Sequence, residues 1–300
     1  PEPPPVGVLT GAPLPEPPAR RRPIVAVKID NAPRAVPQDG LDVADVVFEE
    51  EVEGGITRFV ALYQSRDPGE VGPVRSGREA DAVLLPAFEP VVAISGAAPN
   101  VIADLADADL LVFKEGQAGA FRRRPGRRAP HNLYADVGRL WAAGDALTSP
   151  DEPLWAFVAK TPPGGDRVAG AALTFSPFAS AAWRWSPAQR VWQRRQDGSV
   201  HATAGGEQLT ADNVVVMRVT SAAGDRVDSA GNPTVSIDFT GRGEAVVLRD
   251  GRAYDARWRK RSARSRLRWL DKDGDPFPLA PGRTWVEVLP TGAGFDLRGR

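Results

Sequence analysis

The chain has 300 residues, in which 38 Lys and Arg balance 38 Asp and Glu, and 42% of the residues are hydrophobic. This composition suits one large or two medium globular domains, and the zero net charge gives no support to a nucleic-acid partner. The chain has no cysteine, which excludes disulfides, thiolate catalysis and Cys-ligated metal sites. It has no run of about 18 apolar residues, so no membrane-spanning segment is predicted.

Residues 1–22 are rich in proline and end in the basic run Arg20-Arg21-Arg22. Proline favours extended conformations with few packing contacts, so we expect residues 1–22 to form a linker. The chain starts without Met and without an apolar signal core, which is typical of the tether that remains after a signal segment is removed. The alternative is a boundary cut within a cytosolic protein. Contact with a membrane is expected only through a lost N-terminal anchor.

Residues 23–163 alternate predicted strands and helices, which is typical of an α/β domain with a mixed sheet. Ser76, followed by Glu79 three positions later, matches a capping box and predicts a helix over residues 76–88. Shorter helices are expected around residues 101–105 and 137–141. Short β-branched and aromatic runs predict strands at residues 24–27, 46–48, 59–63, 91–94 and 110–113.

Residues 164–300 are dominated by predicted strands, separated by turn signals such as Asp197-Gly198 and Asp250-Gly251. His201 follows one of these turns and is expected to face solvent. Proline and glycine clusters place the division between the two parts near Gly164. The predicted class is therefore α+β, with an N-terminal α/β domain that holds a charged cleft and a mostly antiparallel β C-terminal domain.

Three arginines suggest a binding site in the N-terminal part. Arg58 begins a predicted strand, whereas Arg75 and Arg78 stand at the start of the predicted helix, where backbone N–H groups and the helix dipole favour anions. Guanidinium groups bind phosphate or carboxylate through two parallel hydrogen bonds. The sequence thus predicts an anion pocket formed by Arg75, Ser76, Arg78 and Arg58. The alternative is an internal salt-bridge network with Asp30, Asp45, Glu49 or Glu53.

His131 is one of two histidines and is the best candidate for a general acid or base near neutral pH. Asn132 beside it could orient the imidazole or donate to an oxyanion, although a structural, hydrogen-bonded histidine is an alternative. Asp30 and Asn31 follow a predicted strand, a position that carries site residues in many α/β proteins, yet Asx residues also cap turns. We include both among the candidate ligand contacts.

The carboxylates between Asp30 and Glu53 could supply an acid and base pair of the glycosidase type, and Glu53 is the candidate we place beside His131. They could also bind a hard cation, but no D-x-D-x-D-G loop is present and no metal site is predicted. A simpler interpretation is that they neutralise the arginines. Gly54-Gly55 and Gly241-x-Gly243 match neither a P-loop nor a dinucleotide fingerprint, so no cofactor is predicted.

The C-terminal part combines Trp183, Trp185 and Trp192 with a basic run from Arg257 to Arg268. Aromatic and basic side chains together can bind glycans or single-stranded nucleic acid, but core tryptophans beside a solvated basic edge are more common. Anionic wall polymers or lipid headgroups would suit the basic edge of an extracytoplasmic protein, and such binding should weaken as salt rises.

Several strings resemble the YerB-like family of bacterial lipoproteins. They are VKIDNAPRAVPQDGLDVADVVFEEEVEGGITRFVALY, GPVRSGR and APHNLY in the first part, and NVVVM, GRGEAVVLRDG and GRTWVEV in the second. The resemblance covers nearly the whole chain. It implies a two-part, extracytoplasmic protein, usually lipid-anchored, in a family of unknown function, and it names no reaction.

These observations lead us to expect an extracytoplasmic cell-envelope protein, membrane-anchored or secreted, that binds an anionic ligand in an arginine-lined cleft. The expected partner is an anionic small molecule or a cell-wall component. One alternative is a hydrolase or transferase that acts on a cell-wall glycan or phosphodiester, with His131 or Glu53 in acid-base roles. Another is a scaffold without a small ligand. The sequence makes no prediction of the oligomeric state.

Overall fold

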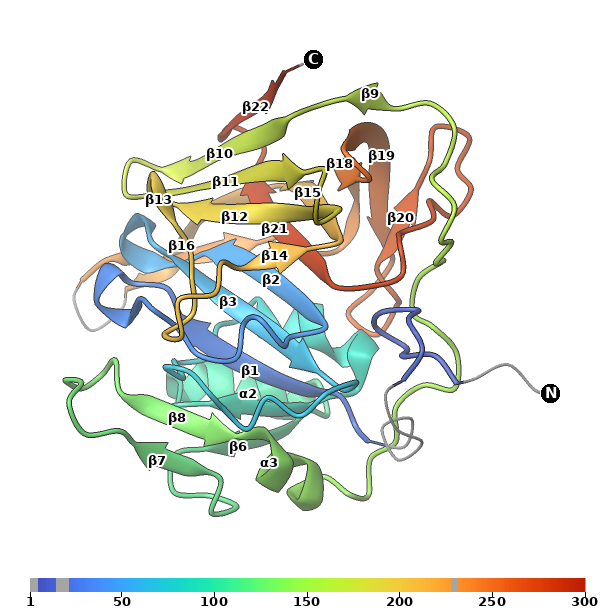
Figure 1. Ribbon diagram of the computed structural model, residues 1–300. Coiled ribbons are helices and arrows are strands. Elements are labelled where there is room, and N and C mark those ends of the chain that lie inside the picture. The colour runs from blue at the N-terminus through green and yellow to red at the C-terminus, as the bar shows by residue number, and fades with distance from the viewer. Residues whose placement is uncertain (1–4, 15–21, 228–230, 300) are drawn as a thin grey trace.

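One large sheet runs through both parts of the chain in the computed structural model, which describes residues 5–14, 22–227 and 231–299 (Figure 1). The sheet has eleven strands. Their order is β20 (Arg268–Leu270), β19 (Arg252–Lys260), β18 (Gly241–Arg249), β15 (Asn213–Val219), β21 (Thr284–Pro290), β2 (Val46–Glu51), β3 (Thr57–Tyr63), β1 (Val25–Asp30), β5 (Val91–Ile94) and β6 (Leu111–Lys114), with β9 (Asp166–Arg167) beside β19.

The pairing directions confirm the predicted α+β class. In the N-terminal part the sheet is mixed, because β1 is antiparallel to β3 and parallel to β5. In the C-terminal part antiparallel pairs dominate, as between β18 and β19. β21 is parallel to both β15 and β2, so it joins the two parts within a single sheet. The division near Gly164 stays a prediction about sequence organisation, since the two parts share this sheet.

A second sheet covers one face of the large sheet, which we call the sandwich face. Its strands alternate between buried and exposed side chains, and Leu173, Trp183 and Trp192 pack with Trp285 of β21 in one core. This sheet consists of β13 (Ser199–Val200), β12 (Val191–Gln196), β11 (Ala179–Ser186), β10 (Gly170–Ser176) and β22 (Gly294–Arg298), with β14 (Thr210–Ala211) on β12. A three-stranded sheet of β4 (Glu70–Val71), β8 (Leu133–Asp136) and β7 (Phe121–Arg123) and helix α3 (Val137–Ala143) extend the same core.

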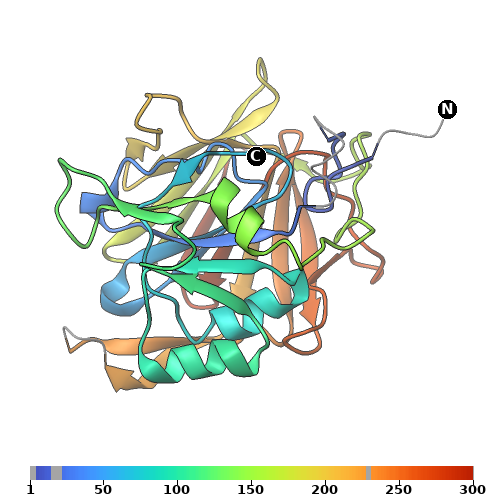
Figure 2. The same ribbon diagram turned by 90° about the horizontal axis from the view of Figure 1, so that it is seen from below.

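Short helices cover the opposite face, which we call the helix face. Leu84, Phe88 and Leu105 pack there against Phe48 and Leu62 of the large sheet. The covering elements are α1 (Asp81–Leu84), the 3-10 turn η4 (Leu85–Phe88) and α2 (Pro99–Asp107). A hairpin of β16 (Ser221–Val227) and β17 (Pro233–Ile237) lies beside α2 when the molecule is seen from below (Figure 2).

Strand periodicity decides which face each polar side chain reaches. Successive residues of a strand point to opposite faces, so in β2 Glu49 belongs with the sandwich face and Glu50 with the helix face. In β1, likewise, Lys28 and Asp30 point to the helix face, because their neighbour Ile29 packs in the sandwich core. The acidic end of β2 therefore supplies carboxylates to two separate places.

The linker prediction is wrong for residues 5–14, whereas residues 1–4 and 15–21 lie outside the described residues. Val8, Leu9 and Thr10 are buried. The carbonyl of Val8 accepts a hydrogen bond from Leu154 N, and that of Thr10 accepts one from Gly282 N. This segment packs on the fold because it contributes apolar side chains among its prolines.

The prediction of a helix over residues 76–88 is also wrong. Only Asp81–Leu84 forms an α-helix, and its cap residue is Ala80 without a side-chain hydrogen bond. Pro86 has no N–H group, and the chain tightens into a 3-10 turn there. Ser76 does not cap the helix, since its Oγ lies 3.4 Å from Ser95 Oγ. The strands predicted at residues 24–27, 46–48, 59–63, 91–94 and 110–113 are confirmed as β1, β2, β3, β5 and β6.

Candidate functional site

Arg58, Arg75 and Arg78 form a cluster at the carboxyl ends of the parallel strands β1 and β5. The loop that carries Arg75 and Arg78 is held between these strands, because Arg75 N donates to Lys28 O and Arg75 O accepts from Ser95 N. Arg58 Nη1 and Arg78 Nη1 both donate to Ser76 O, over 3.0 and 3.3 Å. The carboxyl ends of parallel strands are a common place for ligand sites in α/β proteins.

Two carboxylates pair with this arginine cluster. Arg78 donates to Glu53 Oε2 from Nε and Nη2, over 2.8 and 2.6 Å. Arg75 Nε lies 3.1 Å from Asp30 Oδ2. The predicted salt-bridge alternative is therefore right for Asp30 and Glu53, while the side chains of Asp45 and Glu49 bond elsewhere.

Arg58 is the least satisfied member of the cluster. It is only 5% exposed, forms no ion pair with a carboxylate of the described residues, and has a buried Nε without a hydrogen-bond partner there. Burial, together with repulsion from Arg78 and Arg75, lowers the pKa of Arg58 to about 10. The cluster has three arginines and two paired carboxylates, so its positive charge is not fully balanced. A buried cation without a carboxylate partner is costly for the fold.

Lys28 occupies the carboxylates that lie deeper on the helix face. It bonds to Glu50 and, over 2.6 Å, to Asp81. Burial raises the pKa of Glu50, and the nearby Asp81 adds to the shift, whereas Lys28 opposes it. Both carboxylates are thus engaged by the lysine and make no ion pair with Arg58.

A cavity of about 380 Å³ opens beside the cluster, a volume within the range of ligand sites. Its walls come from the loop around Arg78, the first turn of α2 and the β16–β17 hairpin. The cap residue of α2, Ala98, provides no side-chain hydrogen bond to the N–H groups of that turn. Of the predicted site residues, Ser76, Arg78 and Glu53 line this cavity. The other polar or bulky residues of its lining are Glu79, Asn100, Val101, Arg226, Val227, Thr234 and Val235.

His131 contacts the cluster through Asp30, whose carboxylate also pairs with Arg75. Its Nδ1 lies 2.6 Å from Asp30 Oδ2, and its side chain is 17% exposed. A carboxylate in this position fixes the orientation of an imidazole, as in general-base sites. Asn132 does not take part, because its Oδ1 accepts from Arg123 Nη1 and its Nδ2 donates to Arg127 O.

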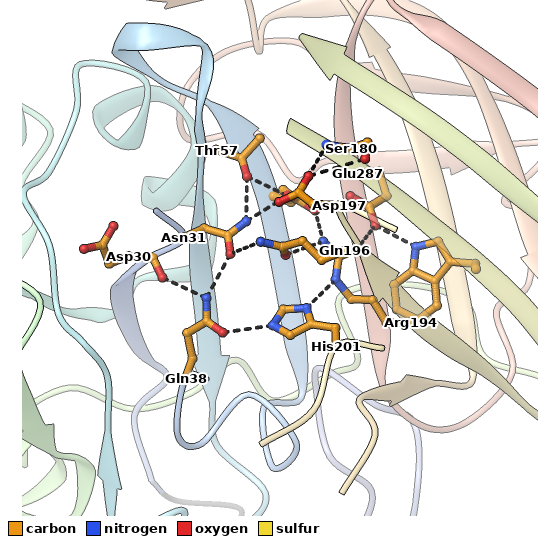
Figure 3. A network of polar contacts seen from close by, with 12 residues as sticks. Asp30, Asn31, Gln38, Thr57, Ser180, Arg194, Gln196, Asp197, His201 and Glu287 are labelled. Carbon is orange, nitrogen blue, oxygen red and sulfur yellow. Dashed lines mark hydrogen bonds and ion pairs between the residues drawn. The ribbon is translucent and has the colours of Figure 1, made fainter. Parts of the chain in front are cut away.

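A second polar network lies on the sandwich face (Figure 3), and we call it the closed network because its central side chains are buried. Arg194 of β12 is fully buried and donates to His201, Glu287 and Glu49. Its guanidinium carbon also lies 4.6 Å from the ring centre of Trp285. The sequence analysis missed Arg194. The residue stands two positions after the buried Trp192 on the same strand, so both side chains point to the same inward face.

The prediction that His201 faces solvent is wrong. The residue is 1% exposed, and its Nδ1 accepts a hydrogen bond from Arg194 Nε over 3.0 Å. Its Nε2 lies 2.9 Å from Gln38 Oε1. Burial and the adjacent Arg194 lower the pKa of His201 to about 2, so the ring stays neutral and serves as a structural link.

Asn31 belongs to the closed network and not to the arginine cluster. Its Nδ2 donates to Thr57 Oγ1 over 2.7 Å, and its Oδ1 accepts from both Gln38 and Gln196 (Figure 3). All its hydrogen-bonding positions are thus in use, which removes it from the candidate ligand contacts. Among the residues that the structure describes, no group of three or more His, Cys, Asp or Glu could hold a metal ion. None of the helices described is long and apolar enough to cross a membrane.

Comparisons with known proteins agree with this architecture. Residues 9–149 match the family model described as the "Protein of unknown function (DUF3048) N-terminal domain", and residues 171–286 match the corresponding C-terminal domain. The chain is 28% identical over 291 residues to the "Putative lipoprotein YerB" of Bacillus subtilis (strain 168). The aligned region covers 94% of this chain and 85% of that protein.

The fold is similar to that of a solved relative. The crystal structure of the YerB protein from Bacillus subtilis superposes with a TM-score of 0.83 at 26% sequence identity, over 97% of this chain and 99% of that chain. Both domain models and the shared fold confirm the resemblance that the sequence strings indicated. The chain therefore belongs to the DUF3048 family.

Proposed function

We propose that this protein is an extracytoplasmic component of the cell envelope, derived from a lipoprotein, that binds an anionic ligand at the arginine cluster. Its membership of a family with a relative named as a lipoprotein supports the location. The ligand would carry phosphate or carboxylate, because guanidinium groups bind these groups through paired hydrogen bonds.

The surplus of guanidinium groups at the wall of a ligand-sized cavity carries this proposal. Arg75 and Arg78 each pair with one carboxylate, whereas Arg58 has none within ion-pair distance among the residues that the structure describes. An anion in the cavity would meet Arg78 and the N–H groups of the first turn of α2 directly. Arg58 would act from behind Ser76, where it donates to the same carbonyl as Arg78.

Replacing Arg78 by lysine tests the proposal, because lysine keeps the charge opposite Glu53 but loses the fork that binds an oxyanion. We expect Arg78→Lys to weaken the binding of pyrophosphate or citrate about tenfold, measured by titration calorimetry, with little change in melting temperature. Arg122→Lys is the matched control, since Arg122 also bonds one carboxylate, Glu70, through Nε and Nη2 but lies on β7. Equal affinities in both variants, or no anion binding by the parent protein, would leave the scaffold interpretation.

A second candidate is a hydrolase or transferase acting on a cell-wall glycan or phosphodiester. The contact between His131 Nδ1 and Asp30 favours it, because a carboxylate at this distance fixes the orientation of an imidazole that could serve as a general acid or base. Glu53 is less suited to acid-base work, since Arg78 occupies its Oε2. Turnover of labelled wall fragments that His131→Ala abolishes without a change in folding would support this activity. Turnover retained by that variant would exclude the role of His131, and no turnover by the parent protein would exclude the activity on these fragments.

A further inference from the structure

A row of three arginines crosses three neighbouring strands at the far end of the large sheet, away from β1 and β5. In the antiparallel register, Arg242 of β18 lies opposite Arg259 of β19, and Arg259 lies opposite Arg268 of β20. Residues paired in this way point to the same face, with Cβ atoms about 5 Å apart. The three side chains, which we call the arginine row, therefore stand next to one another.

The arginine row faces outward. Trp258 and Trp269, which alternate with the arginines along β19 and β20, are buried on the helix face. Arg242 and Arg268 are exposed, and Arg259 between them is half-buried. The row is thus a solvent-facing feature held in place by a packed layer of indole rings beneath it.

The arginine row has no carboxylate partners within the described part of the chain. None of its members forms an ion pair there, and the buried Nε of Arg259 has no hydrogen-bond partner. The nearby Arg264 differs, since it bonds to Asp109. Like charges directly opposite each other destabilise a sheet, so this arrangement is costly for the fold alone and favourable when an anion bridges it.

Three further observations indicate what kind of anion fits. The chain as a whole is neutral, so the row is a local concentration of charge on a balanced molecule. Three more exposed arginines add positive charge nearby: Arg257 on β19, and Arg261 and Arg266 in the loop between β19 and β20. No large hydrophobic side chain of β18, β19 or β20 is exposed, although membrane-surface segments use apolar residues to enter the lipid. Charges in line, without apolar anchors, suit a soluble chain of repeating anions better than a bilayer.

We propose that the arginine row is a second binding site, separate from the arginine cluster, for a linear polyanion of the phosphodiester class. Successive phosphates would lie across the strands and bridge Arg242, Arg259 and Arg268, which relieves their repulsion. The shared chemistry is guanidinium to phosphate, and repetition along the polymer supplies the affinity that one phosphate lacks. The site would hold the protein on an anionic polymer while the cavity beside Arg78 remains accessible.

The test uses synthetic poly(glycerol phosphate) as the probe, with inorganic phosphate and phosphatidylglycerol vesicles as comparison ligands. The triple variant Arg242→Thr, Arg259→Thr, Arg268→Thr should bind the polymer at least about tenfold more weakly, with a shallower dependence of affinity on salt. Its melting temperature should be unchanged or higher, because threonine suits strands and the repulsion is gone. The matched control removes three exposed arginines elsewhere, Arg122, Arg184 and Arg195, and should keep most of the affinity.

Several outcomes would overturn the proposal. Equal loss in the row variant and the control would show that only total charge matters, and binding of vesicles but not of the polymer would assign the row to a membrane surface. Should the triple variant fail to fold, Arg259→Gln provides the same comparison with one substitution. Arg78→Lys should leave polymer binding unchanged. This variant therefore distinguishes failure of the arginine row proposal from failure of the proposal for the arginine cluster.

Discussion

The two faces of the large sheet use arginine in opposite ways. On the sandwich face, Arg194 is fully buried and shares its donors among two carboxylates and the ring of His201. On the helix face, Arg58 is almost as buried but makes no ion pair among the described residues. Adjacent positions of β2 send one carboxylate to each face, where Glu49 pairs with Arg194 and Glu50 pairs with Lys28.

This contrast separates a structural network from a candidate site. Arg194 is paired with two buried carboxylates, and a ligand cannot bind it without breaking these ion pairs. Groups with unused capacity at the wall of a cavity are costly for the fold and available to a ligand. The Arg194 network also draws members from both sequence parts, so it helps to join them. Variants in the two networks should accordingly differ in what they lose.

The largest expected effect comes from breaking the closed network with Arg194→Met. Methionine fills similar volume but leaves Glu49 and Glu287 buried without their cation, so we expect the free energy of unfolding to fall by about 3–5 kcal/mol. Urea denaturation followed by tryptophan fluorescence measures this loss. Arg184→Met, on the exposed side of β11, is the control and should change stability by less than about 0.5 kcal/mol. A small effect at Arg194 would mean that its carboxylates do not depend on it.

A subtler change in the same network concerns the protonation of Glu287. Burial raises its pKa well above the usual 4.5, and the adjacent Glu49 adds to the shift while Arg194 opposes it. An acid with a raised folded-state pKa favours folding at low pH, and this contribution is lost as pH rises above 4.5 through the folded value. In Glu287→Gln the amide oxygen can still accept the hydrogen bond from Trp183 Nε1. Glutamine does not ionise, so the variant does not lose stability through this group as pH rises.

We therefore expect Glu287→Gln to lower stability by about 1 kcal/mol in acid and to become more stable relative to the parent as pH rises. Urea midpoints measured across the pH range for both proteins test this sign. His201 titrates in the parent and the variant alike, so it cancels in the difference. A variant whose disadvantage grows with pH would show that Glu287 is needed as an ionised partner of Arg194.

The sequence predicted the local elements well and the long-range pairing poorly. The strands of the first part were found because β-branched runs mark buried strands wherever they occur. The pairing of β2 with β21 joins residues more than two hundred positions apart, and no local pattern indicates it. The helix at 76–88 failed because tertiary bonds from this loop to β1 and β5 override its capping pattern.

The candidate site was predicted to a similar extent. Sequence reasoning chose Arg58, Arg75 and Arg78, and the structure brings them together with Asp30 and Glu53. It could not assign Asn31 to the opposite face, because that depends on how the chain turns after β1. It also could not find the role of His201, whose burial comes from a sheet packing over it. Residue type thus predicted the chemistry, while the topology decided which groups stay free.

The smallest expected effect on stability comes from the open cluster, with Arg58→Met. The substitution removes a hydrogen bond to Ser76 O, which costs about 1 kcal/mol, but it also removes a buried cation repelled by Arg75 and Arg78. We expect these terms to offset each other to within about 1 kcal/mol in anion-free buffer, as measured by urea denaturation. Affinity for pyrophosphate should nevertheless fall, because the positive potential behind Ser76 is reduced.

The two measurements on Arg58→Met sharpen the contrast between the faces. A loss of about 3 kcal/mol or more would place Arg58 in the same class as Arg194, as a group that the fold itself requires. Retained stability with retained pyrophosphate affinity would show that Arg58 serves neither folding nor binding. The expected result is retained stability with weakened binding. Arg58 is only 5% exposed and lies beside two other arginines. If its removal does not harm the fold, a bound anion that offsets the cost of its burial is the best explanation for its presence.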